Sequence, residues 1–298
     1  MQDYHIPVLL DESVTGLNLQ PGGHYIDLTF GGGGHSREIL RRMDSTARLL
    51  AFDQDRDVIG QLPDDPRFLF AQSNFKYVSN FVRYHQFGPV DGILADLGVS
   101  SHHFDDEARG FSFRYDGPLD MRMNQQARLT AETVLNDYSE QALADVFYLY
   151  GELVQARRIA HRLVEARKQQ RLDSIFAFKD LLLPFCRKDE KKFLAQAFQA
   201  VRIEVNGEMN ALRKMLESAA TQLRPGGRLA VITYHSLEDR VVKNYIKAGN
   251  FEGKVEQDFY GHSLSVFKSV GKLVTPSDSE MQDNPRSRSA KLRIAEKL

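Results

Sequence analysis

The chain has 298 residues, of which 42% are hydrophobic and 27% are charged, a length and composition that suit one large or two ordinary globular domains. Its formal net charge of -1 excludes a global positive field, so any nucleic-acid partner has to be held by local basic surface. Because Cys186 is the only cysteine, an internal disulfide and a multi-cysteine zinc or iron–sulfur site are excluded.

Strand and helix patterns alternate through the first part of the chain. Short apolar runs, typical of buried strands, are predicted at residues 24–28, 48–52, 68–71 and 90–96. Amphipathic spacing predicts helices between them at 36–43 and 78–87. This order predicts an α/β fold with a parallel, doubly wound, Rossmann-like sheet.

The sheet pattern stops at Asp96 and resumes only with a strand predicted at 229–233. A parallel crossover needs about 30 residues including its helix, so the longer interval predicts an insertion. Apolar residues at helical spacing over 138–168 and 176–205 predict that the insertion is mostly helical. The expected domains are a discontinuous one, 1–109 with 206–298, and an inserted one, 110–205.

After the insertion the chain returns to the sheet. Residues 206–223 are predicted as the crossover helix, and the Pro-Gly-Gly at 225–227 as the turn that ends it. A helix is predicted at 237–246, and alternation over 263–273 and 289–295 predicts a closing antiparallel pair.

The beginning of the chain lacks a basic segment followed by a long apolar run, which is the pattern of a secretory signal. No later segment approaches the roughly 20 apolar residues that cross a bilayer. We therefore expect a cytoplasmic protein without a membrane role.

Four consecutive glycines, Gly31 to Gly34, follow the first predicted strand, and Asp53 ends the second. Glycines let backbone N–H groups approach a ligand closely, and a carboxylate at the end of the next strand suits a ribose diol. The dinucleotide fingerprint requires a third glycine, but Ser36 or Arg37 stands there, depending on the register. A shorter adenosyl ligand is therefore favoured over a dinucleotide.

Six blocks of sequence resemble the bacterial 16S ribosomal RNA (cytosine-N4) methyltransferase family, nearly from end to end of the chain. They are DLTFGGGGHS at 27–36, DLGVSS at 96–101, RGFSF at 109–113, DGPLDMRM at 116–123, FQAVRIEVN at 198–206 and HSLEDR at 235–240. The resemblance implies a class I methyltransferase fold with an inserted helical domain. It also implies S-adenosylmethionine as the methyl donor and 16S rRNA within the 30S subunit as the partner, with no metal required.

The resemblance also implies which residues bind the donor. It sets Gly33, Gly34 and His35 against the methionine part, Asp53 on the ribose, and Phe75 and Asp96 around the adenine and sulfonium. The sequence departs from the family after Ser101, where His102-His103 replaces the usual Pro-Gln. An imidazole at His103 can still form a hydrogen bond with S-adenosylmethionine, as donor or as acceptor, but its charge changes near neutral pH.

The lone pair of the cytosine amino group is delocalised into the ring, so an acceptor for the N4 hydrogens would raise its availability for methyl transfer. The first candidates leave the predicted strand that ends at Asp96, and the second follow the strand that ends near 233. The first set is Asp96, Ser100 and Ser101, and the second is His235, Ser236, Glu238 and Asp239. For the second set, a capped and salt-bridged helix start is an equal alternative.

RNA contacts are expected from two basic regions with aromatic neighbours. Arg157, Arg158 and Arg162 form the polar face of a predicted amphipathic helix, although such a face can also be only a solvated exterior. Arg109 and Arg114 interleave with aromatic residues near the expected site. Arg167, Lys168 and Arg171 continue the same predicted helix, and Arg286, Arg288, Lys291 and Arg293 form a second basic run near the end.

Two other classes of protein remain open from the sequence. A nicotinamide dehydrogenase would share the glycine turn and Asp53, and a noncatalytic ribosome-assembly factor would retain a vestigial pocket. His102-His103 with Asp105-Asp106 suggests a metal site, but an exposed polar loop is favoured. Oligomeric state is not predicted.

Overall fold

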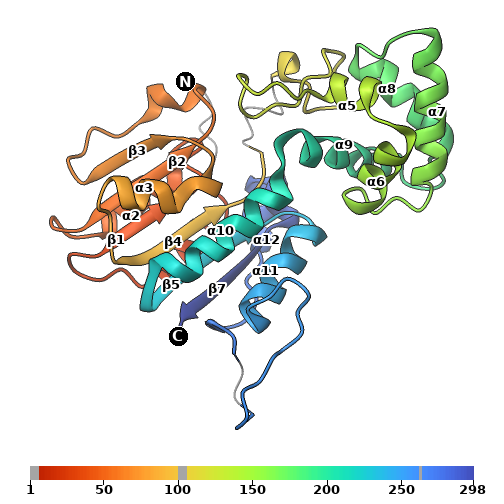
Figure 1. The fold of residues 1–298 in the computed structure, drawn as a ribbon. Helices are drawn as coiled ribbons and strands as arrows, with labels where there is room; N and C mark the ends of the chain where they lie inside the picture. The colour runs from red at the N-terminus through yellow and green to blue at the C-terminus, as the bar shows by residue number, and fades with distance from the viewer. Residues whose placement is uncertain (1–6, 100–105, 262–263) are drawn as a thin grey trace. The chain divides into compact units, whose positions relative to one another are not determined.

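The computed structural model describes residues 7–99, 106–261 and 264–298. The chain divides into two compact units, one formed by Met1–Gly98 with Met209–Leu298 and one formed by Val99–Glu208. The first is called the sheet unit here and the second the helical unit (Figure 1). An inserted, mostly helical second domain is thus confirmed, whereas its predicted role in substrate recognition stays a prediction.

The sheet unit is built on seven strands in the order β3-β2-β1-β4-β5-β7-β6. The strands are β1 His24–Asp27, β2 Arg48–Asp53, β3 Phe68–Gln72, β4 Val90–Asp96, β5 Leu223–Thr233, β6 Phe267–Ser269 and β7 Lys291–Lys297. β1 to β5 pair in parallel, and β7 runs antiparallel to both β5 and β6. The predicted α/β class and the closing antiparallel pair are confirmed.

β5 begins earlier than the sequence pattern predicts. Leu223 pairs with Val90, and the next pair joins Arg228 to Gly92, so β5 carries extra residues against β4 at this point. The Pro-Gly-Gly expected to be a turn is therefore a bulge inside the strand. Proline has no N–H to give to a ladder, which is why this segment does not hold the register.

Helices cover both faces of the sheet. Successive side chains of a strand point to opposite faces, so an apolar core forms on each side of the sheet. One layer packs α3 Val78–Tyr84, α10 Glu208–Gln222 and α11 Ser236–Ala248 against the sheet. The other packs α1 Leu10–Gly16 and α2 Gly34–Arg42. α12 Asp278–Asp283 and the short 3-10 turns η1 Asp57–Gln61, η2 Phe75–Tyr77 and η5 Pro285–Ser289 complete the unit.

The helical unit contains α5 Ala131–Asp137, α6 Glu140–Leu149, α7 Ala156–Gln169, α8 Ile175–Leu182 and α9 Glu190–Asn206, with 3-10 turns η3 Glu107–Arg109 and η4 Leu183–Phe185. Four of these helices begin at a residue whose side chain accepts an N–H of the first turn: Thr130, Ser139, Ser174 and Asp189. Their apolar faces meet in one core, where the rings of Phe178 and Phe198 lie 5.1 Å apart.

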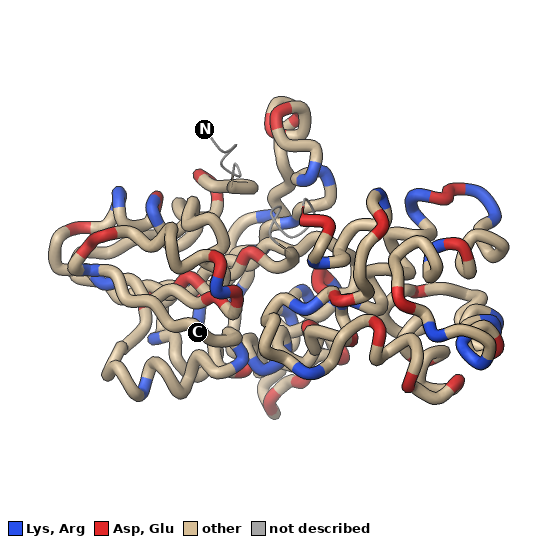
Figure 2. Tube along the Cα trace, turned by 90° about the horizontal axis from the view of Figure 1, so that it is seen from above, with Lys and Arg blue, Asp and Glu red and all other residues tan. Residues whose placement is uncertain are grey.

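Basic and acidic residues are interspersed along the trace of both units (Figure 2). This agrees with the net charge of -1 and means that anion binding has to depend on local groups. Among the described helices, none is both long and apolar enough to cross a membrane.

Candidate active site

The strand order reverses between β1 and β4, which are neighbours in the sheet although β2 and β3 separate them in the chain. Open α/β sheets bind ligands outside the carboxyl ends of the strands at such a switch point. Here the two strand ends are tied together, because the N–H of Asp96 donates to Oγ1 of Thr29 at 2.7 Å. The N–H of Leu28 also donates to the carbonyl of Leu94 at 2.9 Å.

The glycine run leads from β1 into α2, and Gly33 is the residue that precedes the helix, with φ 77°. A Cβ at Gly33 would meet the ring of Phe30 at 2.7 Å, so both the backbone conformation and the available space require glycine. Among the described residues, no side chain caps the N-terminus of α2. The first N–H groups and the positive end of the helix dipole therefore suit a carboxylate or another anion.

Asp27 stabilises the glycine turn through hydrogen bonds to residues on both sides of it. Its carboxylate is fully buried, accepts the hydroxyl of Ser36 at 2.6 Å, and accepts the N–H of Thr29 at 3.0 Å. Burial raises the pKa of Asp27, and these hydrogen bonds oppose the rise. Sequence analysis did not single out Asp27 for this role, although the residue ends β1 four positions before Gly31.

Asp53 connects the end of β2 to the glycine run. Its Oδ2 accepts the N–H of Gly31 at 2.8 Å, and its Oδ1 accepts the N–H of Asp55 at 2.9 Å. The structure thus brings together Asp53 and the glycine turn, two features that the sequence predicts to belong to one site. A half-buried carboxylate in this place has further lone pairs that can accept hydroxyl groups.

Asp96 ends β4 and faces two other polar side chains. The hydroxyl of Tyr234 donates to Asp96 Oδ1 at 2.7 Å, and Nδ1 of His35 lies 3.9 Å from Oδ2. Burial raises the pKa of Asp96 to about 6, although His35 and the Tyr234 hydroxyl favour the charged form. A carboxyl group with this pKa changes charge near neutral pH, which suits a proton acceptor.

Tyr234 is the residue that sequence analysis missed. Burial, followed by the negative charge of Asp96, raises its pKa well above the usual value, so it remains a hydrogen-bond donor. The residue lies immediately after β5 and directly before the HSLEDR block. Its position after a central strand was the available signal, but only the topology shows that β5 lies beside β4.

His235 and Glu238 form the start of α11. Nδ1 of His235 accepts the N–H of Glu238 at 3.4 Å, and the Glu238 carboxylate accepts the N–H of Tyr234 at 3.0 Å. The carboxylate also lies 3.2 Å from Nε2 of His235. Asp239 instead pairs with Arg293 at 2.7 Å. These contacts are those of a capped, salt-bridged helix start, and a role in accepting the N4 proton stays a prediction.

Of the remaining candidates for donor binding and catalysis, some lie among the described residues and others lie outside them. Phe75 opens η2 and packs, half-buried, against the core under the sheet. Ser100, Ser101 and His103 lie outside the described residues. Gly34 opens α2, and His35 in the same turn is buried, with Nε2 3.1 Å from the carbonyl of Val8.

Arg109 requires a correction among the residues expected to contact RNA. Its side chain is only 3% exposed, and the guanidinium donates to the carbonyls of Arg122 and Met123, both at 3.1 Å. Phe111 of the same block is buried in the core of the helical unit. Arg109 therefore stabilises the fold of the helical unit and is not exposed to contact RNA.

The basic face of α7 contains two kinds of residue. Arg157, Arg158 and Arg162 are exposed. Arg167, in contrast, donates to the carbonyls of Leu135 and Tyr138 at 2.8 and 2.5 Å, where α5 ends. Arg114, in the loop before α5, is exposed. The exposed arginines are available to phosphates, whereas Arg167 stabilises the end of a helix.

The pKa of Asp96 predicts a change of stability with pH. The unfolded chain releases this proton near the ordinary value of 3.8, whereas the folded protein keeps it to about 6. The folded state binds more protons in this window, so the free energy of unfolding contributed by Asp96 falls as the pH rises from about 4 to about 6. Urea unfolding at pH 4 and 7 should therefore show a loss in the wild type that Asp96→Asn lacks, by about 1–3 kcal/mol. Equal losses in the two proteins would contradict the raised pKa.

A family model described as the MraW methylase family matches residues 2–298. Similar relatives are ribosomal RNA small subunit methyltransferases H. Those of Parabacteroides distasonis, Bacteroides fragilis YCH46 and Flavobacterium johnsoniae are 61%, 59% and 52% identical, cover 99% of this chain, and are themselves covered over 98%, 97% and 98% of their length.

The chain is similar to an rRNA methylase from Streptococcus thermophilus, with 13% identity, a TM-score of 0.46 and 99% of each chain covered. It is also similar to a Streptococcus mutans protein solved in complex with SAH, with 14% identity, a TM-score of 0.42, and 99% and 100% covered. The full-length family match leaves the nicotinamide dehydrogenase alternative without support, and the chain belongs to the MraW methylase family.

Proposed function

We propose that the protein transfers a methyl group from S-adenosylmethionine to the exocyclic N4 of a cytidine in 16S rRNA of the small ribosomal subunit. The observation that carries this proposal is the match to a methylase family over residues 2–298, with relatives named as small-subunit rRNA methyltransferases. The choice of cytosine N4 in 16S rRNA rests on the six sequence blocks described above.

The groups at the switch point fit the donor chemically. The N-terminus of α2 at Gly33, Gly34 and His35 is complementary to the methionine carboxylate through its backbone N–H groups and helix dipole. Asp53 is an acceptor for the ribose hydroxyls, and Phe75 offers an aromatic face to the adenine. His103 is retained as a further donor contact by resemblance alone.

Asp96 is the residue that we assign to the acceptor side of the reaction. When bound, S-adenosylmethionine supplies an electrophilic methyl group on a positively charged sulfur. An ionised Asp96 accepts a hydrogen bond from the N4 amino group and so raises the availability of its lone pair. Tyr234 orients the carboxylate through Oδ1, which leaves Oδ2 to face the substrate and His35.

Four further residues are proposed either to accept the N4 proton or to hold Asp96 in place. Ser100 and Ser101 follow β4 in the sequence, and His235 and Glu238 follow β5. Positioning supplies much of the rate in a transfer of this kind, because reacting atoms held about 3–3.5 Å apart gain several kcal/mol. No metal is needed for this chemistry.

RNA is held by local basic groups of the helical unit. Arg157, Arg158 and Arg162 present cations along one helix, and Arg114 lies beside the exposed Tyr115, which can stack on an unpaired base. The proposed partner is 16S rRNA within the 30S subunit, in the cytoplasm. Because contacts between these arginines and phosphates release counterions, we expect binding to weaken as salt is raised.

Methyl transfer to ribosomal particles tests the proposed function. Purified protein with labelled S-adenosylmethionine should label 30S subunits from cells that lack this gene, but not subunits from cells that contain it. Mapping of the labelled RNA should give one cytidine modified at N4. Absence of labelling, or a label on another atom or another RNA, would overturn the proposal.

Asp53 provides a test of the donor site. Asp53→Ala should weaken binding of S-adenosylmethionine by about 1–3 kcal/mol, because hydroxyl groups of the ribose lose their acceptor. Calorimetric titration measures this difference, and Asp64→Ala, an exposed aspartate of the same unit, serves as the control. Equal donor affinity in the Asp53 variant and the wild type would rule out the ribose contact.

A further inference from the structure

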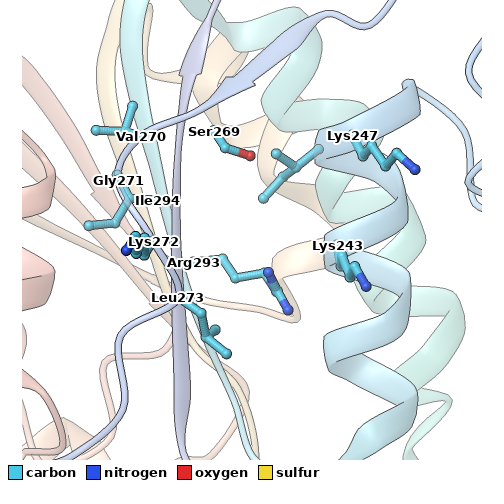
Figure 3. A pocket seen from close by; sticks show the side chains of 10 residues that line it. Lys243, Lys247, Ser269, Val270, Gly271, Lys272, Leu273, Arg293 and Ile294 are labelled. Carbon is cyan, nitrogen blue, oxygen red and sulfur yellow. The ribbon is translucent and has the colours of Figure 1, made fainter.

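A small basic pocket lies in the sheet unit, and none of the residues assigned above to donor and acceptor lines it. Its cavity volume is about 190 Å³, and it lies between α11 and the segment that joins β6 to β7 (Figure 3). Three lysines and an arginine line it: Lys243, Lys247, Lys272 and Arg293. None of the described residues that line the pocket is acidic.

The four cations come from three separate segments of the chain. Lys243 and Lys247 stand one turn apart on α11, Lys272 belongs to the segment after β6, and Arg293 reaches from β7 toward α11 (Figure 3). Like charges four residues apart weaken an isolated helix, and the fold adds two more cations to the same place. An anion in the pocket would relieve this repulsion.

Arg293 is the fixed member of the group. Its Nε donates to Asp239 Oδ1 at 2.7 Å and its Nη2 to Oδ2 at 3.2 Å. Burial alone would raise the pKa of Asp239, but the ion pairs with Arg293 and Lys291 outweigh it and lower that pKa. Asp239 thus stays ionised and neutralises part of the charge of Arg293. The three lysines, all exposed, supply the charge that is left.

The dimensions of the pocket limit its ligand. Sites for cofactors and other small organic molecules usually enclose about 300–1,000 Å³, which is more than this cavity offers. The hydroxyl of Ser269 adds a hydrogen-bond donor to the cations (Figure 3). A small oxyanion such as a phosphodiester group fits this combination better than a nucleoside or an apolar ligand.

We propose that this pocket binds a backbone phosphate of the rRNA substrate, as a second point of contact on the sheet unit. The inference rests on the proposed function, since it deepens the account of how the same RNA is held. Lysine ammonium groups bind phosphate as mobile point charges and carry no sequence information. The pocket therefore positions the RNA and does not select the base.

The test compares two variants with the same loss of charge. Lys243→Gln/Lys247→Gln/Lys272→Gln removes the pocket lysines. Lys214→Gln/Lys254→Gln/Lys268→Gln removes three exposed lysines of the same unit that do not line the pocket. Both are assayed for methyl transfer to 30S subunits from cells lacking the gene, and for binding of naked 16S rRNA at several salt concentrations.

The pocket variant should raise KM for 30S subunits about tenfold and reduce the slope of log K against log salt by about one. The control variant should stay within about twofold of the wild type in both measurements. Calorimetric affinity for S-adenosylmethionine and the thermal midpoint show whether either variant has disturbed the donor site or the fold. Each single Lys→Gln change should give a smaller shift in the same direction.

Two failures are distinguishable in this design. If wild-type protein does not methylate 30S subunits, the proposed function fails. If wild-type protein is active but the pocket variant and the control variant have the same KM and the same salt slope, the pocket does not bind RNA phosphate, and the proposed function stands.

Discussion

The hydrogen bond from the N–H of Asp96 to the hydroxyl of Thr29 is the contact on which the arrangement of the site depends. It joins the ends of β1 and β4, at the point where the strand order of the sheet reverses. From this junction the glycine turn leads into α2, and Asp53 holds the turn from the neighbouring strand. The uncapped helix end and the carboxylates therefore meet at one edge of the sheet.

Much of this arrangement was predictable, because apolar runs and glycines act locally. The strand ends at Asp53 and Asp96 and the turn at Gly33 follow from the pattern of the sequence, and the structure bears out these elements. The contact of Tyr234 with Asp96 was not predictable, since it depends on which strands are neighbours. Burial of Arg109 was also missed, because a charged residue among aromatics is typical of both an RNA surface and a satisfied interior position.

Basic residues in this protein have three different roles, which sequence cannot separate. Arg167 caps a helix through carbonyl groups, and Arg293 forms an ion pair with Asp239. Others, such as Arg157 on the helical unit and Lys243 on the sheet unit, remain exposed. A chain with a net charge of -1 can therefore bind RNA through a few groups at defined places, without a field that would attract nucleic acid everywhere.

We infer that an ionised Asp96, with a pKa of about 6, accepts a hydrogen bond from the amino group that is methylated. Single-turnover methyl transfer to 30S subunits, measured from pH 5 to pH 8 in wild type and Asp96→Asn, tests it most directly. We expect a wild-type rate that rises with pH through an apparent pKa of about 6, and a slow, pH-independent rate in the variant. A variant with the rate and pH profile of the wild type would contradict it.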